Sequence, residues 1–401
     1  MSDQRKNVVQ TGSIDKPSKT LDKTLSGDTV QSMQFSPLDV AKFASGTIEK
    51  ICTTSRIIVP DPFANSSIIK IQRKEFEVGE LVGEGSFSSV YEIARFRATS
   101  KFVDEVNDGE NQEKKFVIKH LASDQCRNES DLMHTASDLA KEAFLLASMG
   151  EHPHILRLRG ISSSGIAGFG NGRPDGFFLI FEKLTDTLFQ RIQAWKASEQ
   201  CTLNIFKSSK STQAIQFMAE RLKIGADLAS AIEYLHDHNI MHRDIKPDNI
   251  GFDSQGNIKL FDFGIFKEIL EGSDNEPYEL TGQVGSFRYM APEVATSRPY
   301  TLKADVYSFT MVIWQMLTLV RPFERLRPDA FKAGVFMENK RPKINKKWPR
   351  ELQVFLGEGW SPNPKERPTI KQALLILREQ SNLLISNTKG AKDRRGKFRG
   401  S

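Results

Sequence analysis

The sequence predicts an α+β protein with two lobes. The smaller lobe has a five-stranded antiparallel sheet with one main helix, and the larger lobe is mostly helical. Short apolar runs bounded by glycine or polar residues recur between residues 76 and 182, which is typical of strands. From about residue 186 onward, apolar residues recur every three or four positions, which is typical of helices. A chain of 401 residues can bury one large core or two smaller ones.

The bulk composition is ordinary for a soluble globular protein, with 39% hydrophobic and 26% charged residues. No run of ~18 uncharged apolar residues suggests a spanning helix, and the first twenty residues lack an apolar signal core. Cys52, Cys126 and Cys201 lie far apart, which favours reduced thiols. We therefore expect a cytoplasmic protein, with the basic C-terminus as an alternative signal for the nucleus.

The net charge of +6 is concentrated at the C-terminus. The last fourteen residues carry +5, which leaves about +1 for the rest of the chain. The high isoelectric point therefore describes a basic tail, residues 386–401, and we expect no specific nucleic-acid binding. The tail is either solvated and disordered or contacts an anionic partner, a membrane surface or the nuclear import machinery.

Residues 1–73 form an N-terminal extension. Residues 1–36 are polar, and we expect them to be disordered. Residues 37–72 are more apolar, with residues at approximately helical spacing at Leu38, Ala41, Ala44, Ile48 and Ile51. This segment is either a loosely ordered lead-in that pads the domain surface or an autoregulatory or partner-binding segment.

The first lobe is expected over residues 74–182. Residues 76–82 predict a strand, residues 83–87 a glycine turn, and residues 88–93 a second strand. Glycines in such a turn let backbone amides approach phosphate oxygens without a Cβ in the way. The turn alone is a weak signal, because glycine turns join many hairpins.

The remaining elements of this lobe follow an acidic insertion at residues 99–115. Residues 116–119 predict a strand that ends in Lys119, and residues 132–149 predict a helix that carries Glu142. Residues 154–158 and 177–182 predict two further strands, separated by a Gly/Ser-rich loop at 161–175. Taken alone, Lys119 would be read as a solvated charge at a strand end.

The second lobe is expected over residues 185–385. Residues 186–196 predict a short helix, residues 197–212 a polar insertion, and residues 212–238 a long helix. Residues 258–260 predict a short strand, and the apolar face over residues 306–317 predicts the central helix of the lobe.

Two motifs in this lobe suggest chemistry. His242-Arg243-Asp244-Ile245-Lys246-Pro247-Asp248-Asn249 is followed by Asp262-Phe263-Gly264. Asp244 could accept a proton from a hydroxyl, Lys246 could hold phosphate charge, and Asn249 and Asp262 offer oxygen ligands to magnesium. Phosphoryl transfer from a nucleotide requires these parts. A loop carboxylate such as Asp244 could otherwise simply cap a turn.

These motifs resemble the catalytic loop and metal-binding motif of the eukaryotic protein kinases. The resemblance implies ATP and Mg²⁺ as cofactors, Asp244 and Lys246 as catalytic residues, and Asn249 and Asp262 as metal ligands. In that family, lysine at position 246 accompanies serine/threonine transfer to protein substrates. Residues 285–293 agree, with Ser286 near the catalytic loop, and residues 305–309 and 365–369 resemble the tyrosine-kinase-like group.

The resemblance also implies a nucleotide site between the lobes. Phe181 would be the gatekeeper at the back of the site, and residues 182–184 would be the hinge whose backbone reads adenine. Glu142, on the predicted helix, is preferred as the partner of Lys119 over Glu113 and Glu129, which we place in polar connecting segments. The implied site residues are Val82, Gly83, Gly85, Ser86, Phe87, Val90, Val117, Lys119, Glu142, Phe181, Glu182, Leu184 and Gly251.

Three positions depart from the family pattern. Ser88 replaces the third glycine of the loop, which suggests a stiffer turn. Val117 stands where alanine is usual above the adenine, and Gly251 stands where a bulky aliphatic residue is usual below it. We expect a compensating trade of volume, in which the larger side chain of Val117 above the adenine makes up for the side chain that Gly251 lacks below it.

The resemblance further implies regulation and internal ion pairing. Arg243 would bind a phosphate on the activation loop. Thr281 is the first candidate acceptor, modified by an upstream kinase or by autophosphorylation, with Ser273 and Tyr278 as further candidates. Glu293 and Arg367 would form a buried ion pair, and Asp305 would bond to the backbone of the catalytic loop.

Two other functions remain to be weighed against an active serine/threonine kinase. A pseudokinase scaffold is disfavoured because the sequence keeps Lys119, Glu142, Asp244, Asn249 and Asp262, and scaffolds of this type typically lack one or more. A kinase of small molecules or lipids is disfavoured because residues 285–293 indicate protein substrates.

Overall fold

The structure of the protein is a computed structural model, and it describes residues 36–397 with gaps. The chain divides into residues 1–32 and 33–401, and all described residues lie in the second unit. The gaps are residues 65–66, 86–87, 99, 103–114, 123–125, 127, 206–209 and 270–285, and the side chains of 200–212, 286 and 388–397 are not described either.

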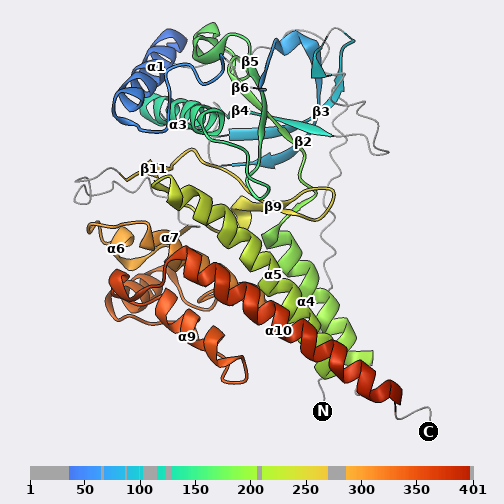
Figure 1. The fold of residues 1–401 in the computed structure, drawn as a ribbon. Helices are drawn as coiled ribbons and strands as arrows, with labels where there is room; N and C mark the ends of the chain where they lie inside the picture. The colour runs from blue at the N-terminus through green and yellow to red at the C-terminus, as the bar shows by residue number, and fades with distance from the viewer. Residues whose placement is uncertain are drawn as a thin grey trace, which may run out of the picture. The chain divides into compact units, whose positions relative to one another are not determined.

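The first lobe contains a six-stranded sheet, one strand more than the sequence predicts (Figure 1). The extra strand, β1, comes from the N-terminal segment and pairs in parallel with β5, so the sheet is mixed. Burial explains its presence, because Ile71 is fully buried with Phe76, Phe102 and Phe178. In spatial order the strands are β1 (Ile69–Ile71), β5 (Leu158–Ser162), β6 (Phe178–Glu182), β4 (Phe116–Leu121), β3 (Ser88–Phe96) and β2 (Phe76–Glu84).

Strand β5 lies further along the chain than residues 154–158, where the sequence predicts it. The backbone of the earlier segment has a different partner, because Leu156 N donates to Leu260 O at 2.9 Å and Leu260 N donates to His154 O at 2.8 Å. Residues 154–156 therefore connect the two lobes. The segment after β5, expected as a loop, contains a 3-10 helix at Gly165–Asn171.

Helix α1 (Pro37–Thr54) packs along helix α3 (Glu129–Ser148) beside the sheet (Figure 1). Val40, Ala44 and Ile48 of α1 are buried in the main core, and Thr47 Oγ1 accepts a hydrogen bond from Ser137 Oγ of α3 at 3.0 Å. The segment that we expected to be either a loosely ordered lead-in or an autoregulatory or partner-binding segment is thus partly a core helix. Part of the N-terminal extension therefore packs against the first lobe.

Helix α3 begins earlier than the predicted residue 132. Asn128 caps it, accepting a hydrogen bond from Asp131 N at 2.8 Å, and Glu129 is its first residue. The expectation that Glu129 lies outside this helix is therefore wrong. Its position in the first turn still leaves it more than three turns from Glu142.

The second lobe is mostly helical, as predicted. Central helix α7 has every residue from Ala304 to Met316 buried, and α10 runs beside α5 (Figure 1). The helices are α4 (Leu188–Ile205), α5 (Lys210–Asp237), α6 (Pro292–Ala295), α7 (Lys303–Thr318), α8 (Pro328–Phe331), α9 (Arg350–Gly359) and α10 (Ile370–Lys397).

Two segments expected to be irregular are helical. Helix α4 continues through Ile205 into the predicted polar insertion, where Glu199 forms an ion pair with Arg221 of α5. Helix α10 continues through Lys397, so most of the basic tail has a helical backbone rather than a disordered one. Both segments lack proline, and the alanine, lysine and arginine residues of the second segment favour helix. Polar composition alone therefore does not end these helices.

Short strands place the loops between the lobes. Strand β9 (Ile250–Phe252) lies between β10 (Ile258–Leu260) and β7 (Asp186–Thr187), and β8 (Ile240–Met241) pairs with β11 (Lys267–Glu268). Strand β8 leads into the His242–Asn249 motif, and β10 leads into Asp262. The first motif lies between β8 and β9, and the second lies between β10 and β11. Because β8 pairs with β11 and β9 pairs with β10, the two motifs are held side by side.

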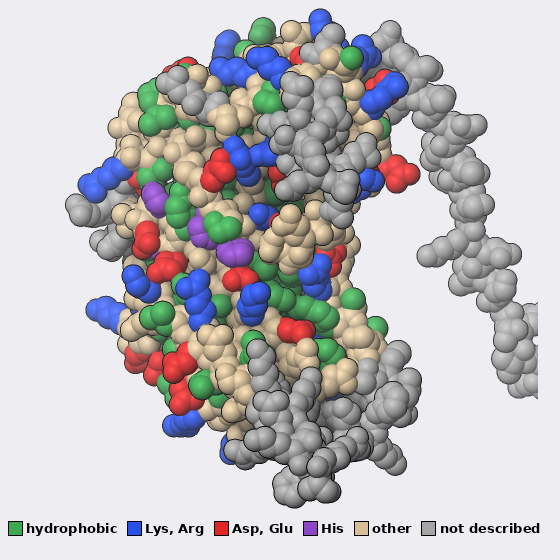
Figure 2. All heavy atoms as spheres, turned by 45° about the vertical axis from the view of Figure 1, so that its right-hand side comes forward, with side chains coloured by type: hydrophobic (Ala, Val, Ile, Leu, Met, Phe, Trp, Pro, Cys, Tyr) green, Lys and Arg blue, Asp and Glu red, His purple; other side chains and the backbone are tan. Residues whose placement is uncertain are grey.

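The surface carries mixed charge. Over the middle and lower part of the face in Figure 2, Lys and Arg side chains are interspersed with Asp and Glu side chains. Within the described ranges, none of the helices is long and apolar enough to cross a membrane.

The packing of α1 predicts that its buried face contributes to global stability. Ile48 is 4% exposed, so Ile48→Ala should lower the free energy of unfolding by about 2–5 kcal/mol. Leu38→Ala, at a position that is 63% exposed, is the control and should cost much less. Urea unfolding measures both, and equal losses would contradict the assignment of α1 to the core.

Candidate active site

Lys119 joins three elements at the centre of the candidate site. Its Nζ lies 2.7 Å from Glu142 Oε2, on α3, and 2.9 Å from Asp262 Oδ1, just after β10. The Lys119 side chain is 12% exposed and that of Glu142 only 3%, whereas that of Asp262 is 43% exposed. The predicted pair of Lys119 and Glu142 is therefore present, with Asp262 as a second anion facing open space.

Burial and charge act in opposite directions on these three groups. Burial alone would lower the pKa of Lys119, but the two carboxylates raise it above its ordinary value. Burial raises the pKa of Glu142 despite its contact with Lys119. Burial would also raise the pKa of Asp262, but the charge and hydrogen bond of Lys119 keep it below its usual range. Asp262 is thus held as an anion near neutral pH.

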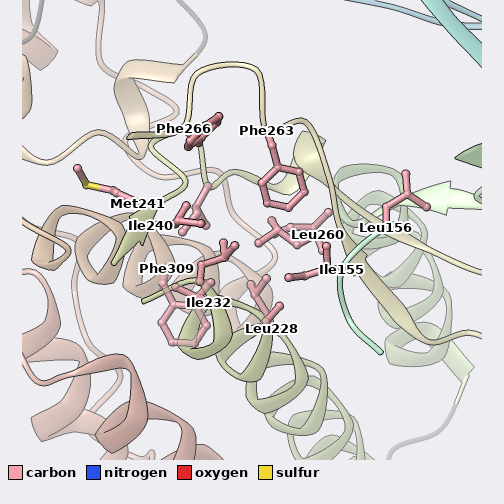
Figure 3. Packing of buried hydrophobic residues seen from close by; sticks show 14 of the residues in the cluster. Ile155, Leu156, Leu228, Ile232, Ile240, Met241, Leu260, Phe263, Phe266 and Phe309 are labelled. Carbon is pink, nitrogen blue, oxygen red and sulfur yellow. The ribbon is translucent and has the colours of Figure 1, made fainter. Parts of the chain in front are cut away.

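The residues after Asp262 attach this segment to α3. Phe263 N donates to Glu142 Oε1 at 3.3 Å, and a Cβ on Gly264 would lie 3.3 Å from Asp138 Cβ on the same helix. The Phe263 ring is fully buried and turns toward Leu260 and Ile155, above α5 (Figure 3). Asp262 itself has φ +68°, a left-handed conformation that aspartate tolerates better than most residues.

Lys246 and Asn249 both form hydrogen bonds with the carboxylate of Asp244, the predicted base. Asp244 Oδ2 accepts hydrogen bonds from Lys246 Nζ at 2.6 Å and from Asn249 Nδ2 at 2.8 Å. Asn249 Nδ2 also donates to the backbone oxygen of Asp244 at 2.9 Å. These bonds fix the rotamer of the Asp244 side chain and leave its other oxygen for a further partner.

Asp305 organises the start of the catalytic loop, as predicted. Its carboxylate accepts hydrogen bonds from His242 N at 2.8 Å and Arg243 N at 3.0 Å, and His236 Nε2 lies 3.2 Å away. Arg243 has φ +72°, and this pair of backbone bonds holds that strained turn in place.

Our sequence analysis assigned no role to His242, which the structure places under the site. Its ring is fully buried, its Nε2 lies 3.1 Å from Phe261 O, and its centroid lies 4.9 Å from that of Phe263. His242 therefore couples the catalytic loop to the segment that carries Asp262. The only sequence signal for this role was its position directly after an apolar strand.

The predicted adenine pocket combines sheet residues and the connection between the lobes. Val117 and Phe181 are buried neighbours in the pairing of β4 with β6. Lys183 N donates to Lys115 O and Thr185 N donates to Phe252 O, both at 2.8 Å. The amide of Leu184, between them, has no hydrogen-bond partner among the described residues, so it is free to bind a ligand. Glu182 instead pairs with Arg159 at 3.1 Å.

The glycine turn is the tip of the β2–β3 hairpin. Gly83 pairs with Val90, and a Cβ on Gly83 would meet no atom within 4 Å, so a ligand can approach its backbone. Gly85 N donates to Ser88 O at 2.8 Å, which closes the turn. Val82, the residue before Gly83, is 46% exposed. Ser86 and Phe87 lie outside the described residues.

The two predicted metal ligands, Asn249 and Asp262, each have an oxygen left for a divalent cation. The Asn249 amide nitrogen is used in hydrogen bonds, which leaves its oxygen, and Asp262 has one oxygen beyond the contact with Lys119. In the described ranges, no three His, Cys, Asp or Glu side chains are grouped to hold a metal. Mg²⁺ commonly takes one or two carboxylates and completes its shell with phosphates and water.

The predicted ion pair of the second lobe is also present. Arg367 Nη1 and Nη2 lie 2.5 Å and 2.8 Å from the two oxygens of Glu293, and the Arg367 side chain is fully buried. Glu113, Ser273, Tyr278, Thr281 and the side chain of Ser286 lie outside the described residues.

Comparison with known proteins gives consistent matches. Residues 76–376 match the protein kinase domain family. Serine/threonine-protein kinase STY46 of Arabidopsis thaliana is 25% identical over 328 residues, 82% of this chain and 48% of that protein. Serine/threonine-protein kinase TNNI3K of Homo sapiens is 27% identical over 312 residues, 77% of this chain and 32% of that protein. The chain thus spans less than half the length of these relatives.

The contacts of Lys119 predict a pH-dependent loss of stability when it is removed. Lys119→Met leaves Glu142 and Asp262 without their cation, and breaking such a buried pair typically costs about 3–5 kcal/mol. Without the charge of Lys119, burial raises the pKa of both Glu142 and Asp262 above the unfolded-state values, so that both carboxyls bind protons in the folded state at a higher pH than in the unfolded chain. The loss should therefore be larger at pH 7.5 than at pH 5.5.

Urea unfolding of Lys119→Met at the two pH values measures this effect. Arg95→Met is the control, because Arg95 pairs with Glu77 at the surface and its loss should change stability little at either pH. A Lys119→Met loss of stability that does not depend on pH would contradict the prediction.

Proposed function

Because the chain belongs to the protein kinase family, we propose that it transfers the γ-phosphoryl group of ATP to serine and threonine hydroxyls of protein substrates. The observation that carries this proposal is the convergence of Lys119, Glu142 and Asp262 beside the Asp244–Lys246–Asn249 cluster. Mg²⁺ would be held by Asn249 and Asp262, and it would neutralise phosphate charge when bound.

In the proposed reaction, Asp244 orients the substrate hydroxyl and accepts its proton. The hydroxyl oxygen forms a bond to the γ-phosphorus while the bond from that phosphorus to the bridging oxygen breaks, which releases ADP. Lys246, held 2.6 Å from Asp244 Oδ2, would place its positive charge beside the transferring group. Lys119 would bind the α- and β-phosphates, with its position fixed by Glu142.

The choice of hydroxyl follows from Lys246 and from the relatives. STY46 and TNNI3K carry serine/threonine kinase names, which supports the type expected from the sequence. A second candidate is dual specificity, because serine/threonine/tyrosine-protein kinase HT1 of Arabidopsis thaliana is 33% identical over 156 residues, 39% of each chain. Peptide substrates that contain only tyrosine as acceptor separate the two.

Arg243 supports a proposed dependence on activation-loop phosphate. Burial lowers the pKa of Arg243 to about 10, against the opposing effects of Tyr300, Asp305 and Asp138. A partly buried cation gains from a phosphate dianion nearby. We expect mass spectrometry of active protein to find phosphate between Ser273 and Thr281, first at Thr281, added by an upstream kinase or by the protein itself. Full activity with this segment unmodified would overturn the proposal.

Asp244→Asn is expected to separate binding from transfer. Removing a positioned base typically costs about 10²–10⁴ in rate, while ATP affinity should change little because Asp244 is not assigned to the nucleotide. Asp248→Asn is the matched control, since Asp248 lies in the same loop but is exposed. Labelled-ATP transfer to a generic protein substrate and calorimetric ATP binding with Mg²⁺ measure the two effects.

The outcomes of this experiment also separate the other candidate functions. A wild-type protein that binds ATP but transfers nothing would indicate a scaffold, and transfer only to small molecules or lipids would exclude a protein kinase. Equal rates for Asp244→Asn and the wild type would remove Asp244 as the base.

A further inference from the structure

Gly251 sits where a side chain would collide with the hinge. It is the middle residue of β9, and a Cβ built on it would lie far inside van der Waals contact with Leu184 Cδ1. The same Cβ would lie 3.3 Å from Leu184 Cγ and 3.3 Å from Phe261 Cε1. The space that a larger residue would fill is therefore already occupied by Leu184.

Sheet pairing fixes this close approach. Gly251 pairs with Lys259 on one side and with Thr187 on the other. Next to Leu184, both Thr185 N, at 2.8 Å, and Thr185 Oγ1, at 3.1 Å, donate to Phe252 O. Glycine inside a strand often marks such a close backbone approach. The connection between the lobes thus lies directly against β9, and Leu184 has little freedom to move away.

This arrangement offers a different source of volume from the trade expected from the sequence. That hypothesis let Val117, in the sheet above the adenine, compensate for the missing side chain of Gly251. The space beside Gly251 is occupied by Leu184, which packs against the main core and remains half-buried.

We propose that Leu184 provides the floor of the adenine pocket, and that Gly251 is required because of it. The inference rests on the proposed ATP-dependent function. One residue then performs two tasks, with its backbone amide available to read the edge of the base and its side chain packed beneath the base. Leu184 and Gly251 together determine the depth of the pocket.

A swap of volume between the two positions tests the proposal. Gly251→Leu should bind Mg-ADP about tenfold or more weakly, because overpacking displaces the floor. Leu184→Ala should bind about fivefold more weakly, because it removes apolar contact with the base. The double variant Leu184→Ala/Gly251→Leu restores one leucine to the shared space, and its affinity should return to within about threefold of wild type.

Unfolding without nucleotide gives a second, independent readout. Gly251→Leu should lower the melting temperature and the double variant should recover most of the loss, since the collision exists in the free protein. Gly357→Leu is the control substitution, because a Cβ at Gly357 lies 3.9 Å from Ile344 Cδ1 and far from this site along the chain. It should leave the affinity for Mg-ADP unchanged.

The outcomes distinguish this inference from the proposed function. Independent, additive losses in the double variant, in both affinity and melting temperature, would overturn the shared floor while leaving the kinase assignment intact. Recovery of melting temperature without recovery of affinity would place Leu184 against Gly251 but away from the adenine, which also overturns the proposal. Failure of the wild type itself to bind Mg-ADP would instead overturn the proposed function.

Discussion

The ammonium group of Lys119 is the point at which three separately placed segments meet. Strand β4 supplies the cation, α3 supplies Glu142, and the segment after β10 supplies Asp262. A lysine and a glutamate this deeply buried are stable as ions only because they neutralise each other. Any shift of α3 away from the sheet would therefore strand charge, so the position of the helix and the charge state of the site depend on each other.

Several weaker contacts keep α3 in the position that this ion pair requires. Phe263 N bonds to Glu142 from one side, and the buried face of α1 covers the helix from another. The residues after α1 extend the support, because Val59 N donates to Ser148 Oγ at 3.4 Å and Arg56 N donates to Glu268 Oε1 at 2.9 Å. Glu268 lies on β11, shortly after Asp262. The N-terminal segment thus contacts α3, which carries Glu142, and β11, which follows the segment that carries Asp262.

The sequence was sufficient to group the candidate site residues and insufficient for part of the architecture. The catalytic side chains lie at short, fixed spacings, so Asp244, Lys246 and Asn249 could be grouped before any fold was known, and helical placement selected Glu142. Long-range pairing has no such local signal. Strand β1 and the shift of β5 depend on distant partners, 91 residues away at Gly160 and Ser162 for β1 and more than 100 residues away at Leu260 for residues 154–156. Gly251 could be recognised as a missing volume, but only the hinge geometry shows what fills it.

The position of α1 outside the matched residues 76–376 has a practical consequence. A fragment trimmed to that match would lose α1, whose residues Val40, Ala44 and Ile48 are buried in the main core, and would leave bare the apolar stripe that they cover. A bare apolar stripe of this kind promotes self-association in water. Expression of the catalytic unit should therefore start upstream of Pro37, where the helix begins, and not at the edge of the recognisable domain.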